Sequence, residues 1–132
     1  MREIKFRGQR IDNKEWIYGF YNYTFERGYN SQSYDDVPNR CRYIDTDINY
    51  YEIKGHTVGQ YTGLKDENGV EIYEGDIVKN PSGYLEKIIF NDGSFKVASI
   101  KYPNAKLYLL SLHNDYVKVI GNIYENEDYL AD

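Results

Sequence analysis

The stretch that decides the fold is VGQYTGLKDENGVEIYEGDIVK, residues 58–79. A polar block, Lys65–Gly69, separates two apolar segments, and glycines recur at the spacing of turns. We predict a strand over Thr57–Tyr61, a type I turn over Asp66–Gly69 that ends in the left-handed conformation, and a further strand from Ile77. This pattern predicts a β-rich protein, and it contains no nucleophile, metal-ligand set or phosphate-binding loop.

A second hairpin is predicted around Asp92-Gly93. Asp-Gly is the preferred two-residue type I′ turn, because both central residues need a positive φ. A two-residue loop here places Phe90 opposite Phe95 and Ile88 opposite Val97, so that all four apolar side chains share one face. The structural turn positions predicted along the whole chain are Gly63, Gly69, Gly75, Asp76, Asp92, Gly93 and Gly121.

The N-terminal segment Ile4–Phe25 has the pattern of a hairpin with a polar turn at Asp12–Glu15. Trp16, Tyr18 and Phe20 alternate along its second half, which places three aromatic rings on one face of a strand. Such rings can fill a core or a subunit interface, or they can stack on single-stranded nucleic acid beside the basic N-terminus. We favour packing, and the candidate interaction residues are Arg7, Trp16, Tyr18 and Phe20.

The remaining segments continue the β-rich pattern. Residues 26–42 are rich in turn formers and show no period, so we predict a long loop. Short strands are expected at Tyr43-Ile44, Tyr50–Ile53, Leu107–Leu112 and Tyr116–Tyr124. Asn126 is expected to cap a last helical turn through Leu130. The strand spacing after Gly75 predicts a small closed or half-closed barrel of about five strands.

Composition narrows the class of protein. The chain has 132 residues, of which 16 are tyrosine, and a net charge of −5. Tyrosine favours strands and is enriched in protein–protein contacts, whereas net acidity argues against a large phosphate-binding surface. Cys41 is the only cysteine, no apolar run reaches membrane-spanning length, and no secretory leader is recognisable. We therefore expect a cytoplasmic protein without a disulfide or a membrane partner.

The acidic cluster Glu71, Glu74 and Asp76 is the nearest approach to a catalytic site. Paired carboxylates perform acid–base chemistry when their surroundings drive their pKa values apart. We favour a structural role instead, in which Asp76 accepts hydrogen bonds from turn amides at the start of a strand.

A calcium loop is suggested by the spacing Asp45-x-Asp47-x-Asn49. The pattern fails at Tyr50, where the loop needs a glycine, and at His56, where it needs a bidentate glutamate. We interpret the segment as an acidic surface turn. The sequence thus assigns no catalytic residue, no metal site and no cofactor.

Three blocks of sequence resemble one known family. They are MREIKFR (residues 1–7), QYTGLKDENG with EIYEGDIV (residues 60–69 and 71–78), and VIGNIYEN (residues 119–126), and they look like the YopX family of phage and prophage proteins. The blocks stand in the family's order, whereas residues 26–51 match no pattern of the family. The resemblance implies a mainly β protein with an SH3-like C-terminal part, made from a phage or prophage gene in the cytoplasm of a bacterial host. It also implies self-association, and it supplies no catalytic residues.

The resulting prediction is a mainly β fold made of hairpins, a C-terminal SH3-like small barrel and a short C-terminal helical turn. Residues 1–57 are expected to form an N-terminal β subdomain with a variable loop excursion, and residues 58–132 the SH3-like barrel subdomain. The expected function is that of a non-enzymatic interaction or self-assembling protein, with a homo-oligomer or a host or phage protein as the partner.

Two alternatives remain at this point. The first is a nucleic-acid-binding module that uses the small barrel, a reading that rests on fold analogy. Its phosphate contacts would be Arg2, Lys5, Arg7 and Arg10. The second is an enzyme of unrecognised type, whose acidic cluster would have to line a pocket.

Overall fold

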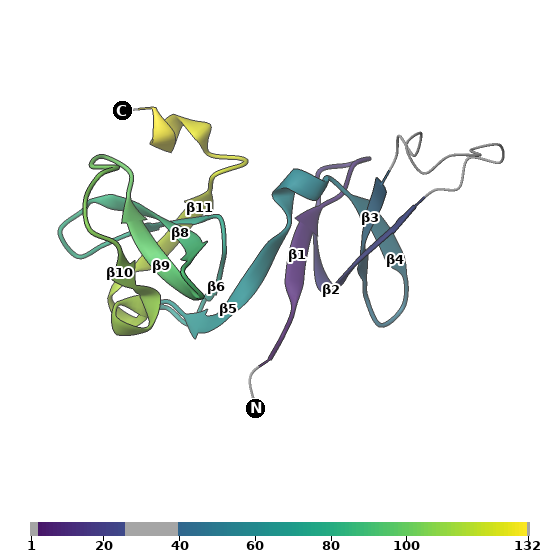
Figure 1. Ribbon diagram of the computed structural model, residues 1–132, viewed down its shortest axis with the longest axis horizontal. Helices are drawn as coiled ribbons and strands as arrows, with labels where there is room; N and C mark the ends of the chain where they lie inside the picture. Colours follow the sequence, from purple (N-terminus) through teal and green to yellow (C-terminus); the bar gives the residue numbers. More distant parts are fainter. Residues whose placement is uncertain (1–2, 26–39, 132) are drawn as a thin grey trace. The chain divides into compact units, whose positions relative to one another are not determined.

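The computed structural model describes residues 3–25 and 40–131. In these ranges the chain consists of antiparallel strands joined by turns and short 3-10 helices (Figure 1). From Ile4 onward it divides into two compact units, Ile4–Gly59 and Gln60–Asp132, called here the N-terminal unit and the C-terminal unit. The mainly β fold predicted from the sequence is confirmed.

The N-terminal unit is an antiparallel meander with one short helix. Its elements are β1 (Phe6–Gln9), β2 (Trp16–Phe25), β3 (Arg40–Asp45), β4 (Tyr50–Ile53) and the 3-10 helix η2 (Gly55–Thr57). The predicted first hairpin is confirmed, since β1 pairs with β2 and Gln9 faces Trp16. The prediction of a loop reaching residue 42 is wrong at its end. Arg40–Arg42 belongs to β3, because β2 extends to Phe25 and pairs with these residues, with Phe25 opposite Arg40.

Glycines let the strands of the N-terminal unit pack closely. Among the residues of this unit whose burial is described, Ile44 and Ile53 are the most buried apolar side chains, at 0% and 3% exposure. A Cβ on Gly8 would lie 2.4 Å from Cδ1 of Ile53, and a Cβ on Gly19 would lie 2.2 Å from the carbonyl oxygen of Asp45. A side chain at Gly19 would therefore displace the backbone of the neighbouring strand, and one at Gly8 would displace the buried side chain of Ile53.

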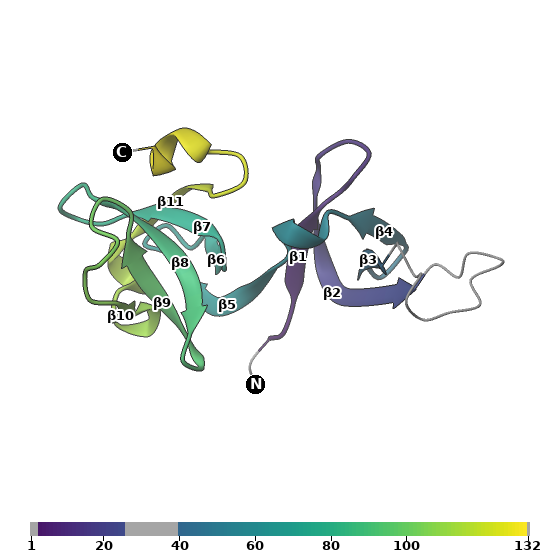
Figure 2. The same cartoon turned by 45° about the horizontal axis from the view of Figure 1, so that its top comes forward.

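The C-terminal unit contains two sets of paired strands. Its strands are β5 (Gly59–Lys65), β6 (Glu71–Tyr73), β7 (Asp76–Lys79), β8 (Leu85–Asn91), β9 (Ser94–Ser99), β10 (Tyr108–Leu109) and β11 (Lys118–Asn122). β5 pairs with β6, and the other five form a sheet in the order β10-β9-β8-β7-β11 (Figures 1 and 2). In the part of the chain that the structure describes, the two end strands β10 and β11 are not paired with each other, so the predicted SH3-like barrel is not confirmed.

Short 3-10 helices replace part of the expected C-terminal strands. They are η3 (Leu110–Leu112), η4 (Asn114–Tyr116) and η5 (Glu127–Leu130). The prediction of a strand up to Leu112 is wrong, because the chain turns at Leu110 and buries that side chain completely. The last helical turn is present as η5, but the side chain of Asn126 does not cap it. Its Oδ1 instead accepts a hydrogen bond from the Asn122 amide at 3.0 Å. No helix within residues 3–25 or 40–131 is long and apolar enough to cross a membrane.

The β8–β9 hairpin carries much of the C-terminal core. Asp92 and Gly93 have φ values of 48° and 81°, which confirms the type I′ turn. Phe90 faces Phe95 and Ile88 faces Val97, as predicted. The buried cluster of this unit consists of Ile72, Val78, Ile88, Phe95, Val97, Leu110 and Val117. Phe90 lies on the same face as this cluster but is not part of the buried core, since its side chain is 53% exposed.

The remaining predicted turn glycines differ in what they do. Gly69 and Gly75 have φ values of 78° and 92° and lie in turns. Gly63 has a φ of 82°, but it lies within β5, where the register against β6 shifts. Gly121 is not a turn residue, since it lies within β11 beside a β-bulge. A Cβ there would lie 2.3 Å from Oδ1 of Asn126, so glycine makes room for that side chain.

Candidate interaction surface

One face of the N-terminal sheet presents a group of aromatic rings. Because side chains alternate along a strand, the register places Tyr18 and Phe20 of β2 on the same face as Tyr43 of β3 and Tyr50 of β4. These four residues are called the aromatic face. Tyr18 is 48% exposed, and Phe20 and Tyr50 are each 66% exposed.

Two further candidate residues support the aromatic face from the β1 side. Trp16 lies on the same face and is half-buried. The guanidinium carbon of Arg7 lies 4.8 Å from the centre of the Trp16 ring, a cation–π distance. Arg7 is only 7% exposed, so its charge contacts the neighbouring ring and is not offered to a phosphate.

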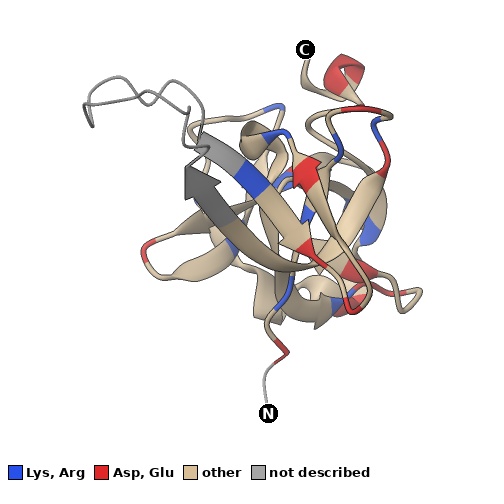
Figure 3. Ribbon diagram, turned by 90° about the vertical axis from the view of Figure 1, so that its right-hand side faces the viewer, with Lys and Arg blue, Asp and Glu red and all other residues tan. Residues whose placement is uncertain are grey.

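Two acidic residues lie among the rings of the aromatic face. Strand β2 contains no charged residue. Figure 3 colours the lysines and arginines of the neighbouring strands blue and their aspartates and glutamates red. Asp45 lies opposite Phe20 on one side and Tyr50 on the other, and Glu52 lies opposite Tyr43. Tyr43 and Tyr50 contact each other edge to face, with their ring centres 5.6 Å apart. A partner of this face therefore meets mainly rings, with two carboxylates among them.

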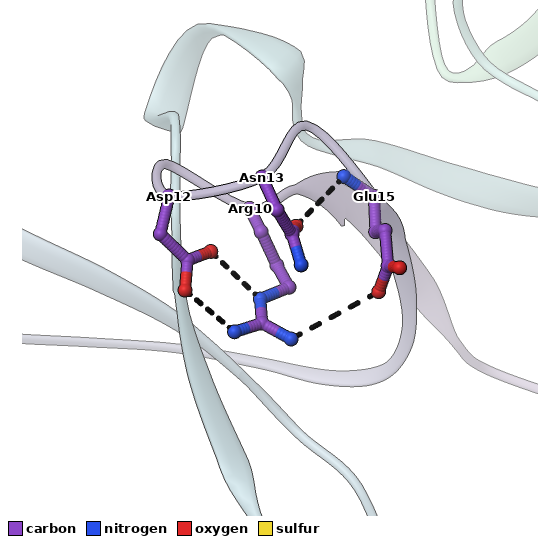
Figure 4. Close-up of polar contacts among 4 residues, drawn as sticks. All are labelled: Arg10, Asp12, Asn13 and Glu15. Atoms are coloured by element: carbon purple, nitrogen blue, oxygen red, sulfur yellow. Dashed lines mark hydrogen bonds and ion pairs between the residues drawn. The ribbon is translucent and has the colours of Figure 1, made fainter.

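The β1–β2 turn neutralises a second arginine (Figure 4). Arg10 donates to both carboxylate oxygens of Asp12, at 2.9 and 2.6 Å, and lies 3.9 Å from the carboxylate of Glu15. Its guanidinium carbon is also 4.6 Å from the centre of the Tyr51 ring. Hydrogen bonding to Arg10 lowers the pKa of Asp12, and the same pair raises the pKa of Arg10. The Asn13 side chain accepts the amide of Glu15 at 3.0 Å and stabilises the turn. Arg10 is thus a structural residue of the hairpin.

Two members of the acidic cluster, Asp76 and Glu71, accept local hydrogen bonds. Asp76 is 1% exposed and accepts the Tyr73 amide at 2.7 Å. Glu71 accepts the hydroxyl of Tyr73 at 3.4 Å. The structural role predicted for Asp76 is therefore observed. Among residues 3–25 and 40–131, no group of three or more His, Cys, Asp or Glu side chains is arranged to hold a metal ion.

Tyrosine and lysine side chains also gather on the C-terminal unit, a feature that the sequence reading did not single out. Tyr84, Tyr102 and Tyr108 are each about half exposed, at 46%, 54% and 49%. Lys101 and Lys106 lie within cation–π distance of these rings. The signal was present as two tyrosines and two lysines around Pro103, but only the fold brings residue 84 to residue 102.

Glu86 of β8 borders this second group and has a perturbed pKa. Partial burial raises the pKa of its carboxyl, against the opposing effects of a hydrogen bond from Asn80 and the charge of His113. A raised folded-state pKa means that the folded protein holds this proton more tightly than the unfolded chain does. Its favourable contribution is therefore complete below the ordinary pKa of glutamate and is lost as pH rises through the raised value.

We expect Glu86→Gln to raise the melting temperature at neutral pH by a small amount, on the order of 2 °C, because it removes a partly buried charge. The difference from the wild type should shrink as the pH falls and vanish at about pH 3, well below the ordinary pKa of glutamate, where Glu86 is protonated in both states. Thermal unfolding at a series of pH values measures this. An advantage for the glutamine variant that stays constant with pH would contradict the assignment.

Comparison with known proteins identifies the family. The family model described as "YopX protein" matches residues 5–131.

The chain belongs to the YopX family.

The crystal structure of protein EF1440 from Enterococcus faecalis is similar to this YopX-family protein, with a TM-score of 0.57 and 24% sequence identity. The similarity covers 98% of this chain and 99% of the EF1440 chain, and it supports the overall fold. No curated protein matches the chain.

Proposed function

We propose that this YopX-family protein is a non-enzymatic protein of a phage or prophage that self-associates in the bacterial cytoplasm, and that the aromatic face is its self-association surface. The observation that carries the proposal is the exposure of Tyr18, Phe20 and Tyr50 on one face of a sheet. Aromatic residues are enriched at the centres of protein interfaces, where they contribute most of the binding free energy.

The area of the face suits a dimer interface. A fully exposed aromatic side chain presents about 150–250 Å². At the observed exposures of 48%, 66% and 66%, the three rings together present roughly 300–450 Å². A standard interface buries about 800 Å² on each partner. The rings therefore supply close to half of one partner's share, and a second copy supplies the same patch through a two-fold axis.

We expect Phe20→Ser to weaken self-association about 30-fold, since it truncates a central ring of the interface. Sedimentation velocity over a concentration series measures the change. Phe90→Ser is the matched control, because Phe90 is also an exposed strand phenylalanine, at 53%, but lies in the C-terminal unit. A wild-type protein that sediments as a monomer at micromolar concentration would contradict the proposal, as would equal effects of the two substitutions.

Salt separates self-association from binding of a basic partner. Two copies that meet through this face bring their Asp45 and Glu52 carboxylates together, and salt screens that repulsion. The dimer should therefore become tighter as ionic strength rises. Binding of a basic partner to the same carboxylates would instead weaken with salt, so weakening of the self-associated form would contradict the two-fold arrangement.

A further inference from the structure

The C-terminal unit carries an ordered group of exposed rings and cations at the end of the β8–β9 ladder that lies away from its turn. The group consists of Tyr84, Lys101, Tyr102, Lys106 and Tyr108, called here the tyrosine–lysine cluster. The rings of Tyr84 and Tyr102 lie 6.3 Å apart and meet edge to face. The Lys101 ammonium lies 5.8 and 5.5 Å from these two ring centres, and that of Lys106 lies 5.9 Å from the Tyr108 ring.

Backbone hydrogen bonds fix the loops that hold these rings. The side chain of Asn80 accepts the amide of Tyr84 at 3.0 Å, and the Asn80 amide donates to the carbonyl of Tyr84 at 2.9 Å. The Ser99 hydroxyl accepts the amide of Tyr102 at 3.0 Å. The Ile100 amide donates to the carbonyl of Leu85 at 3.1 Å, which joins the two loops. The rings are thus preorganised, and a ligand that stacks on them does not have to order the loops.

The charge of the cluster is positive and is not neutralised by neighbours. Among the described residues, neither Lys101 nor Lys106 takes part in an ion pair, in contrast to Arg10. Glu86 borders the cluster, but its carboxylate is hydrogen-bonded to Asn80 and lies near His113. The two ammonium groups lie against aromatic rings, and each keeps hydrogen-bond donors for an anion.

Exposed rings beside unpaired cations match one class of ligand. Bases stack on aromatic side chains whatever their sequence, while phosphates take the lysines. A duplex hides its bases within the helix, and two lysines are too few to hold a duplex by charge alone. We propose that the tyrosine–lysine cluster is a binding site for single-stranded nucleic acid. This proposal does not depend on self-association, because the cluster and the aromatic face lie in different units.

Fluorescence anisotropy of a short, labelled oligo(dT) tests the site over a salt series. Two phosphate contacts predict that log K falls with log salt with a slope of about −1.4 for a single strand. Lys101→Gln or Lys106→Gln should each reduce the steepness of the slope by about 0.7. Tyr102→Leu should lower the affinity about tenfold and leave the slope unchanged, because it removes a stacking surface and no charge.

Controls keep the outcome specific. Lys14→Gln removes an exposed lysine from the N-terminal unit, and Phe90→Ser removes an exposed ring at the opposite end of the β8–β9 ladder. Both should bind as the wild type does, and so should the self-association variant Phe20→Ser. Absence of binding at the lowest salt would overturn the proposal, as would equal losses with Lys14→Gln and Lys101→Gln. Salt-independent binding of a proline-rich peptide, with no binding of oligo(dT), would also overturn it.

Discussion

Replacing Asp66 with alanine should lower the free energy of unfolding of the C-terminal unit by about 3 kcal/mol, because it removes three hydrogen bonds to a charged acceptor. Asp66 is 5% exposed. Its Oδ1 accepts the amides of Asn68 and Val70 at 2.8 and 2.9 Å, and its Oδ2 accepts the amide of Val119 at 2.9 Å. One carboxylate thus fixes its own turn and connects that turn to β11, 53 residues away in sequence.

Two substitutions show whether the carboxylate geometry carries this effect. Asp66→Asn keeps one oxygen that can accept the turn amides, but its NH₂ group then faces the amide of Val119 and cannot accept it. This variant should therefore lose about half as much free energy of unfolding as Asp66→Ala. Glu67→Ala removes the neighbouring, exposed carboxylate and should change stability by less than about 0.5 kcal/mol. Hydrogen exchange of amides in the two units provides the readout. Equal effects of Asp66→Ala and Glu67→Ala would contradict the prediction.

Gly75→Val should destabilise the C-terminal unit by roughly 3 kcal/mol or more, since it combines backbone strain with a steric clash. The φ of Gly75 is +92°, a region that a β-branched residue rarely enters. A Cβ there would lie 3.1 Å from Cε2 of Tyr124. The backbone cannot relax, because the Gly75 amide donates to Ile88 and its carbonyl accepts the amide of Ile123, each at 2.9 Å.

Gly69→Val separates the two causes. Gly69 has a φ of +78°, yet no atom lies within 4 Å of a Cβ placed there, so this variant carries the strain without the clash. It should lose less stability than Gly75→Val in thermal unfolding. The sequence also predicts a smaller effect for Gly28→Val, although Gly28 lies outside the described residues. Equal shifts for Gly69→Val and Gly75→Val would show that the Tyr124 contact is unimportant.

The elements predicted correctly from the sequence are those whose signals are local. The register of β8 and β9 follows from Asp92-Gly93, because a two-residue turn leaves one way to pair the flanking strands. The left-handed φ of Gly69 follows from turn chemistry in the same way. Arg40–Arg42 was predicted as loop because it is surrounded by turn-forming residues. It forms a strand only because it pairs with β2, and the local sequence does not indicate that partner.

The candidate surfaces were predicted only in part, because strand alternation is a local signal whereas burial depends on distant strands. Alternation alone placed Trp16, Tyr18 and Phe20 on one face of a strand. It could not show that Phe20 is exposed while Arg7 is buried against Trp16, since burial depends on the strands that pair beside them. The tyrosine–lysine cluster could not be predicted from the sequence, because the whole β8–β9 hairpin separates Tyr84 from Tyr102 in the chain.

The sequence by itself determined the β class, the two hairpin turns, the left-handed conformation of Gly69 and Gly93, and, through three blocks spread along the chain, the YopX family. The first three of these depend on residues that are close together in the chain, where sterics and turn hydrogen bonds act without a distant partner. The tertiary structure alone decided that the five-stranded sheet stays open, that Asp66 connects its turn to β11, and which aromatic rings reach solvent. Those outcomes depend on contacts between segments far apart in sequence, whose free energy exists only once the strands have paired.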